Sequence, residues 1–170
     1  LWQREACRRA KTLHKEHRFD IVHQLTMIGY REPGYLWKLD GVPFVWGPVG
    51  GGPDEPIAFL PLYSFSAKIK VVIRNILNGL QKRLLLRPRM AARRAKKIWV
   101  GTDVDERMVK GLWGMDCERM IETAASPSSL GSVRPWDGRE PLRIVWSGTH
   151  TYGKALPILI HALADLKSKG

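Results

Sequence analysis

The sequence predicts an α/β fold built on a parallel sheet, and three observations lead to this prediction. Short apolar runs that suit buried strands alternate along the chain with longer segments of helical periodicity. The run at residues 42–47 is continuously apolar, as expected for a strand covered on both faces of a parallel sheet. Glycines directly follow two of the runs, at positions where such folds bind ligands.

The first predicted elements alternate strictly between helix and strand. A helix is expected over residues 3–17, and a short strand with an apolar middle is expected at 20–25. Residues 33–39 predict a short helix that the Asp40-Gly41 pair closes. The run VPFVWG, residues 42–47, then predicts a second buried strand.

A long amphipathic helix is predicted over residues 64–85, after a proline-containing loop. Its apolar side chains recur at helical spacing on one stripe, with lysine and arginine opposite. The stripe consists of Ile69, Val72, Ile73, Ile76, Leu80 and Leu84. Pro88 is expected to interrupt this helix, which resumes over residues 89–97. The pattern leaves open whether the stripe packs into the core or lies on a membrane surface.

A third strand and a third long helix are predicted next. The strand covers residues 97–102, and Asp103 is expected to cap the following helix, with Glu106 completing a capping box. This helix is expected to end at Gly114, before a fourth strand over residues 119–125.

A linker is predicted at residues 126–141, which are rich in serine, proline and glycine and have no periodicity. A strand at 142–147 and a helix at 154–167 are expected after it. We therefore expect one domain over residues 1–125 and the start of a second over 142–170. Because the chain opens within a helix and stops after one strand and helix of the second domain, we expect a piece of a longer protein.

The charge of the chain predicts an anionic partner. Lysine and arginine number 28 against 16 acidic residues, which gives a formal charge of +12. The segment from Ser66 to Lys97 contains basic residues and no acid. Such a surface attracts lipid head groups, nucleic acid or phosphorylated substrates, and the alternative is a solvated helix face.

Other classes of protein are disfavoured by the composition. No run of 18 apolar residues is present, so no membrane-spanning helix is expected. The charged first twenty residues are unlike a signal peptide. Cys7 and Cys117 are far apart in sequence and predict two reduced thiols rather than a disulfide or a metal site.

A glycine-bearing loop with a lysine follows the strand predicted at 142–147. Gly148 lets the backbone approach a ligand, and Lys154 stands at the start of the last helix, where an anion is favoured. The pattern GTHTYGK matches the spacing of a P-loop, but Ala155 follows where serine or threonine would hold magnesium. An ordinary connection with a surface lysine remains the alternative.

Taken together, these motifs resemble those of glycosyltransferase family 4, retaining sugar transferases of the GT-B fold with two Rossmann-like domains. The segment RIVWSGTHTYGKALPILIHAL is similar to the opening of the family's second domain. Upstream, FDIVHQL, VPFVWGPVGGG and AKKIWVGTDVDERMV are similar to successive strand ends of its first, acceptor-binding domain. The resemblance covers nearly the whole chain and implies a Rossmann-like first domain that is incomplete at its N-terminus.

The resemblance implies transfer of a sugar from a nucleotide-diphospho-sugar to an acceptor with retained anomeric configuration. No metal and no further cofactor are implied, because positive side chains and helix N-termini stabilise the departing diphosphate. Gly148, Thr149 and Lys154 would contact that diphosphate. The family commonly has arginine where this chain has Thr149, so one cation is missing unless Lys154 or His150 compensates. The chain alone is not expected to transfer sugar.

The glycines Gly50, Gly51 and Gly52 follow the second predicted strand, and we hypothesise that they line the cleft against sugar or phosphate. A tight turn that needs positive φ is the alternative. Many family members carry a catalytic histidine after this strand, and His23 is the nearest candidate here; its alternative is a hydrogen bond to a neighbouring loop. Arg31 and Glu32 either face the same cleft or form a surface ion pair.

The expected partners are a nucleotide-sugar donor and a saccharide or lipid-linked acceptor. Family members with envelope or lipid-linked acceptors often dock on the inner membrane face, so a cytoplasmic protein that is peripheral at an anionic membrane is expected. The competing class is a basic nucleic-acid-binding module without catalysis. Against it, no recognition motif is present, and Trp46, Trp99 and Trp146 fall within predicted buried strands.

Overall fold

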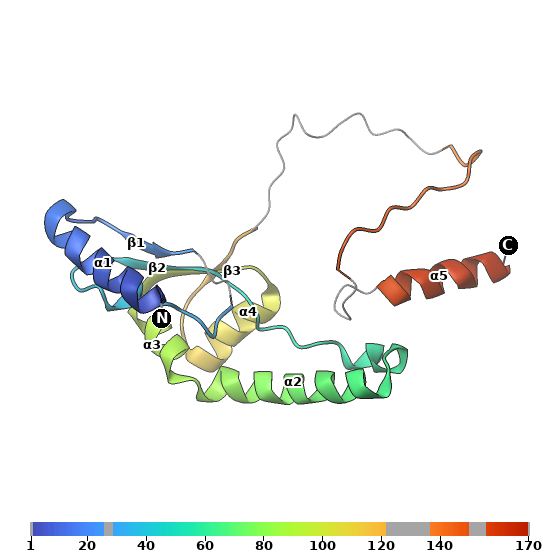
Figure 1. The fold of residues 1–170 in the computed structure, drawn as a ribbon, viewed down its shortest axis with the longest axis horizontal. Helices are drawn as coiled ribbons and strands as arrows, with labels where there is room; N and C mark the ends of the chain where they lie inside the picture. Colours follow the sequence, from blue (N-terminus) through green and yellow to red (C-terminus); the bar gives the residue numbers. More distant parts are fainter. Residues whose placement is uncertain (1, 26–28, 122–136, 150–155, 170) are drawn as a thin grey trace. The chain divides into compact units, whose positions relative to one another are not determined.

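A computed structural model describes most of the chain as two compact units (Figure 1). The described residues are 2–25, 29–121, 137–149 and 156–169. The first unit comprises Leu1–Asp54 with Arg74–Thr123, and the second comprises Glu55–Ile73 with Ala124–Gly170. The first unit contains the sheet and all the residues around the triglycine loop, 50–52.

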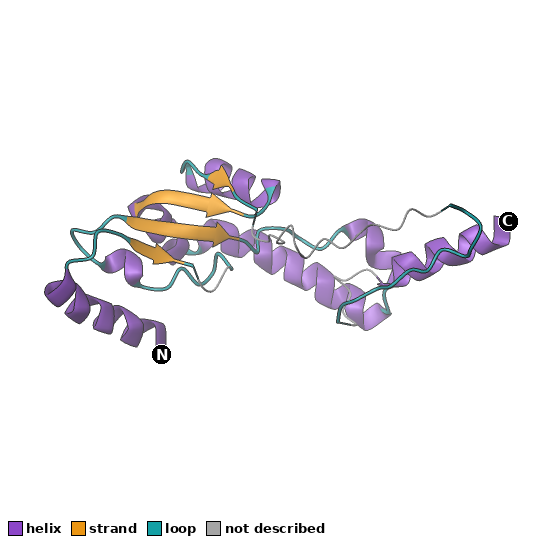
Figure 2. Cartoon of the chain, turned by 90° about the horizontal axis from the view of Figure 1, so that it is seen from above, coloured by secondary structure: helices purple, strands orange, loops and turns teal. Residues whose placement is uncertain are grey.

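The sheet of the first unit is parallel, as the sequence predicts. Its strands are β1 (Val22–Gln24), β2 (Phe44–Val49), β3 (Ala95–Val100) and β4 (Glu118–Arg119). They lie side by side in sequence order and point in the same direction (Figure 2). All carboxyl ends therefore meet at one edge, which is the edge where open α/β sheets bind ligands.

The hydrophobic core of this unit is centred on β2 and β3. Trp46 pairs with Gln24 on one side and with Ile98 on the other, and it is 2% exposed. Its indole stacks on Trp113 with ring centroids 5.9 Å apart and planes 4° apart. Each large side chain buried in this way stabilises the fold by about 1.5–3 kcal/mol. The continuously apolar β2 and the buried residues of β3 thus form the centre of the core.

The helices of the first unit lie close to the predicted positions. They are α1 (Trp2–His17), the 3₁₀ turn η1 (Leu36–Lys38), α3 (Leu86–Arg94) and α4 (Asp103–Arg107), which continues into the π turn η3 (Met108–Leu112). Helix α3 contacts β2 and β3, while α4 contacts β3 and β4. The helical segment that starts with α4 ends before Gly114, whose φ of +67° suits a glycine after a helix, as predicted.

Two details of these helices differ from the prediction. The N-cap of α4 is Thr102 rather than Asp103, because the Thr102 hydroxyl accepts the Asp105 N–H at 3.2 Å. Pro88 does not break a helix where it stands. The chain leaves the helix at Leu85, which has extended backbone angles, and Pro88 then lies in the first turn of α3, where its missing N–H costs nothing.

The long helix α2 (Phe65–Leu84) has apolar side chains on two faces. Ala67, Val71 and Asn78 are at most 5% exposed and form its inner face. The predicted stripe lies on the other side and remains exposed. Its members are Ile69 (45%), Val72 (42%), Ile73 (51%), Ile76 (58%), Leu80 (49%) and Leu84 (68%). Packing of the stripe into the core, one of the two readings of the pattern, is therefore not what the structure shows.

The second unit contains the 3₁₀ segment η2 (Ile57–Leu62), the start of α2 and the helix α5 (Leu156–Lys169). Tyr63, Ala67 and Val71 form a small cluster with Phe59 and Leu60. The strand predicted at 142–147 does not form, although the last helix does. Within the described residues no strand pairs with this segment, and a lone strand leaves its backbone groups without ladder partners.

Both cysteines are buried free thiols, which confirms the prediction of two unpaired cysteines. Burial raises the pKa of the Cys117 thiol, because the thiolate would lose its hydration. Among the described helices, none is long and apolar enough to cross a bilayer.

Candidate ligand site at the carboxyl edge of the sheet

Three segments meet at the carboxyl edge of the sheet, each following a different strand. Gly29 after β1 forms a parallel bridge with Gly50 after β2, and the Tyr30 N–H donates to the Gly50 carbonyl at 2.9 Å. Gly101, after β3, approaches the same loop from the other side, where its N–H donates to the Val49 carbonyl at 3.4 Å. The triglycine loop, residues 50–52, therefore lies in the middle of this edge.

The structure gives an internal reason for two of the three glycines. A Cβ atom on Gly52 would lie 2.6 Å from the Asp105 Oδ1 atom, a distance at which the two atoms clash. Gly51 has a φ of +81°, which other residues rarely adopt. Both explanations come from within the protein: the positive φ of Gly51 fits the tight-turn alternative, and Gly52 is explained by the close approach of Asp105. A role of the loop in ligand binding stays a prediction.

Asp105 holds the loop from the side of α4. Its side chain is 1% exposed, and its Oδ1 accepts the Gly52 N–H at 2.8 Å. Its Oδ2 accepts the Thr102 hydroxyl at 2.6 Å. The buried carboxylate thus has a hydrogen-bond donor on each oxygen, which offsets its loss of hydration. Asp105 links the triglycine loop to the N-terminus of the helix after β3.

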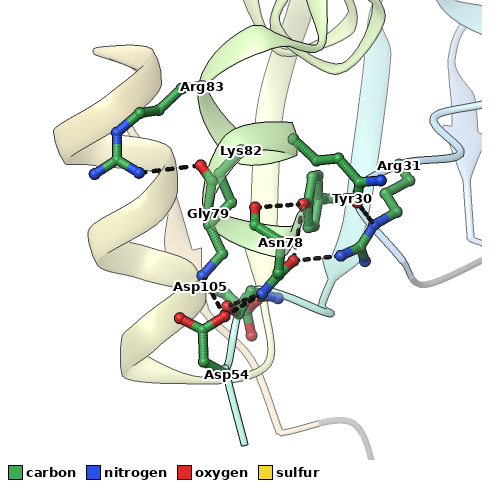
Figure 3. A network of polar contacts seen from close by, with 10 residues as sticks. Tyr30, Arg31, Asp54, Asn78, Gly79, Lys82, Arg83 and Asp105 are labelled. Atoms are coloured by element: carbon green, nitrogen blue, oxygen red, sulfur yellow. Dashed lines mark hydrogen bonds and ion pairs between the residues drawn. The ribbon is translucent and has the colours of Figure 1, made fainter. Parts of the chain in front are cut away.

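Asn78 holds the loop from the side of α2 and is the centre of a polar network (Figure 3). It is 3% exposed. Its Nδ2 donates to the Gly52 carbonyl at 3.1 Å and to Asp54 Oδ1 at 2.5 Å. Its Oδ1 accepts the Tyr30 hydroxyl at 2.9 Å and also the Arg31 Nη2 group. One amide side chain therefore connects the segments after β1 and β2.

The cations around this network have different partners. Lys82 pairs with Asp54 at 3.2 Å, and Arg87 pairs with Glu32 at 3.0 Å. Of the two alternatives for Glu32, the ion pair is the one that forms, although with Arg87. Arg31 instead donates from Nε to the Gln81 Oε1 atom at 2.5 Å, and its guanidinium lies 4.5 Å from the centroid of the Tyr30 ring.

Tyr30 lies completely inside this cluster, with 0% exposure. Burial raises the pKa of its hydroxyl, because the phenolate would be poorly solvated, and the positive charge of Arg31 works in the opposite direction. The hydroxyl consequently remains a hydrogen-bond donor to Asn78 at neutral pH.

His23 lies on β1, next to the strand that precedes the triglycine loop. Its Nε2 is 2.8 Å from the Gly47 carbonyl oxygen of β2, so this nitrogen carries the proton and donates it. The edge of its ring meets Trp99 with centroids 5.3 Å apart. The hydrogen bond is the alternative that the sequence left open beside catalysis. In the described part of the chain, no contact joins His23 to the Asn78 network.

The predicted donor-binding residues belong to the second unit. Gly148 and Thr149 are exposed, and a Cβ on Gly148 would lie 2.9 Å from the Trp146 ring. Lys154 lies outside the described residues. The triglycine loop belongs to the first unit. No group of three or more histidine, cysteine or acidic side chains that could hold a metal occurs among the residues described.

Sequence reasoning missed Tyr30, Asn78 and Asp105. Asp105 carried a usable signal, because Thr102 and Asp105 have the three-residue spacing of a capping box. Asn78 carried a weaker signal. It interrupts an apolar helix on the face that also holds Ala67, the small residue expected where a helix approaches its neighbours closely.

Comparisons with known proteins add no assignment to this geometry. No protein-family model matches the chain, and no similar protein was found among curated proteins or among solved structures.

Proposed function

We propose that this chain is part of a retaining glycosyltransferase of the GT-B type that transfers a sugar from a nucleotide-diphospho-sugar to an acceptor. The observation that carries the proposal is the position of the triglycine loop. It follows the central strand β2 at the carboxyl edge of a parallel α/β sheet, where ligands bind in this class of fold. The order of the sequence motifs along the chain supports the same reading.

In this proposal the acceptor lies at the carboxyl edge of the first unit, and the donor lies at the segment 148–154. The bond between the anomeric carbon and a diphosphate oxygen breaks, the carbon bonds to the oxygen of an acceptor hydroxyl, and the proton of that hydroxyl passes to the departing diphosphate. The negative charge that grows on the diphosphate needs a nearby cation and free N–H groups. Lys154 and the start of the last helix would supply them, with Thr149 beside them and Gly148 allowing close approach.

The test is calorimetric titration of UDP- and GDP-sugars into the natural protein that contains this chain. Lys154→Ala should weaken donor binding about 10-fold or more, because a charge-assisted hydrogen bond contributes about 1.5–3 kcal/mol. Lys167→Ala, at the far end of the same helix, is the matched control and should bind normally. If no sugar nucleotide binds, or if both variants bind like the native protein, the proposed donor site is wrong.

The same titration, with oligonucleotides added as ligands, tests the competing proposal of a basic nucleic-acid-binding module. Tight, salt-dependent binding of oligonucleotides without any binding of sugar nucleotides would favour it. Three of the tryptophans count against stacking on nucleic-acid bases. Trp46 and Trp113 stack on each other in the core, and Trp99 contacts His23, so these rings are already packed against protein.

A second proposal concerns location: we infer that α2 attaches the protein to the cytoplasmic face of an anionic membrane. The observation that favours this is the exposed stripe, Ile69 to Leu84, which lies opposite the inner face of the helix. Lys68 and Lys70 border it, and no acid occurs from residue 56 to residue 102. Like charges oppose pairing of two such helices, whereas anionic lipid supplies both apolar contact and opposite charge.

Vesicle flotation tests this attachment. Binding to phosphatidylglycerol-containing vesicles should fall as salt is added, and neutral phosphatidylcholine vesicles should bind little. Ile73→Glu should abolish the binding, whereas Leu13→Glu, at a similarly exposed position of α1, should leave it intact. Equal binding to both vesicle types, or dimerisation without lipid, would contradict the proposal.

A further inference from the structure

Arg31 differs from the other cations of its cluster in having no acidic partner. Among the described residues its guanidinium contacts the Gln81 amide oxygen, the Asn78 amide oxygen and Tyr30, the last at both the ring face and the hydroxyl. All three groups are neutral. Across the described ranges of the chain, no carboxylate lies within ion-pair distance of Arg31, although Lys82 and Arg87 each have one. A half-buried positive charge is thus left without neutralisation at the carboxyl edge.

Among the described residues, one nitrogen of this guanidinium makes no hydrogen bond. Nε and Nη2 are occupied, while Nη1 has no hydrogen bond to any residue that the structure describes. Gly51 lies beside this nitrogen. A Cβ atom at this position would lie 3.6 Å from Nη1 and 3.8 Å from the Tyr30 ring, so a longer side chain could reach over the group. Because it has no side chain, Gly51 itself does not cover Nη1.

We propose that Arg31 binds an oxyanion, a phosphate or carboxylate group of a small-molecule ligand, through its Nη1 edge beside Gly51. The guanidinium is oriented in advance by Gln81, Asn78 and Tyr30, so little side-chain freedom is lost when the anion binds. A charge-assisted hydrogen bond to an oxyanion is also among the stronger contacts that arginine makes.

The two carboxylates of the cluster, Asp54 and Asp105, have partners other than Arg31. Asp54 lies at the other end of the Asn78 amide and pairs with Lys82. Asp105 accepts from Gly52 and Thr102. The proposal that Arg31 binds an anion rests only on the contacts of Arg31 and on its position beside Gly51. Assigning the anion to the acceptor substrate additionally rests on the proposed function.

Three sugars that differ in one substituent provide the probes: glucose 6-phosphate, glucuronate and glucose. Each is titrated into the chain while the NMR signals of the Gly51 amide and the Arg31 Nε–H group are followed. Saturable shifts with the phosphate, the carboxylate or both are expected, and the comparison shows which oxyanion is preferred. Glucose should cause no such shift. The measurement needs no sugar nucleotide, so its outcome is independent of the proposed donor site.

Arg31→Gln should weaken anion binding about 10-fold, and Arg31→Lys should weaken it less, because a positive charge remains. Arg8→Gln removes the same charge from the exposed face of α1 and should change affinity less than about twofold. Native affinity in a folded Arg31→Gln chain, equal shifts with glucose, or no saturable binding of either anion would overturn the proposal. If Arg31→Gln loses its native circular dichroism, Arg31→Lys provides the same comparison.

Discussion

Replacing Asn78 with alanine should destabilise the first unit by about 3 kcal/mol. Asn78 is buried, and its amide bonds to the neutral Tyr30 hydroxyl and Gly52 carbonyl contribute about 1 kcal/mol each. The bonds to Arg31 and Asp54 add about 1 kcal/mol together, because both charged partners reach solvent. The Asp54 side chain, for example, is 45% exposed and can rehydrate when its partner is removed.

The assay is urea unfolding followed by tryptophan fluorescence, which reports on Trp46 and Trp113 in the core of the same unit. Thr12→Ala is the control, since the Thr12 hydroxyl makes only one long, exposed bond within α1, and it should cost less than about 0.5 kcal/mol. A loss below about 1 kcal/mol for Asn78→Ala would refute the reasoning. It would mean that the loop and Tyr30 find other partners at little cost.

Two further predictions concern the same cluster. Gly52→Ala should destabilise the unit by about 2 kcal/mol or more in urea unfolding, because the added Cβ would clash with the Asp105 carboxylate. Gly111→Ala is the control and should be neutral or mildly stabilising, because a Cβ at Gly111 has no atom within 4 Å. Equal effects of the two substitutions would contradict the close approach of Asp105 to Gly52. Tyr30 contributes stability that is present below its unfolded pKa near 10 and is lost as the pH rises through its raised folded pKa. The free energy of unfolding should therefore fall more steeply above pH 10 for the native chain than for Tyr30→Phe, and parallel curves would show that burial of Tyr30 has no such effect.

The elements that the sequence predicted well are those whose signal is local. The apolar run at 44–49 and the caps around α4 are encoded within a few residues, so their positions were predicted to within one or two residues. The segment 142–147 has an equally good strand pattern and forms no strand, because pairing needs a neighbour that periodicity does not provide.

The network of the candidate site could not be predicted in the same way. Helix α2 is apolar on two sides, and periodicity alone does not tell which side is buried. The larger side chains of Ile73 and Ile76 lie on the exposed side. The inner face follows instead from the small Ala67 and from bonds that Asn78 makes to distant residues.

The way the triglycine loop is held has a consequence for the order of folding. Gly52 depends on Asn78, 26 positions away, and on Asp105, 53 positions away, while Asn78 depends on Tyr30 across 48 positions. Each contact closes a long stretch of chain, which costs conformational entropy. None of these contacts can stabilise the loop before the helices have docked. The loop should consequently acquire its shape after the transition state, with φ-values near zero for Gly52 substitutions. Its amides should also be among the first in the unit to exchange with solvent during local opening.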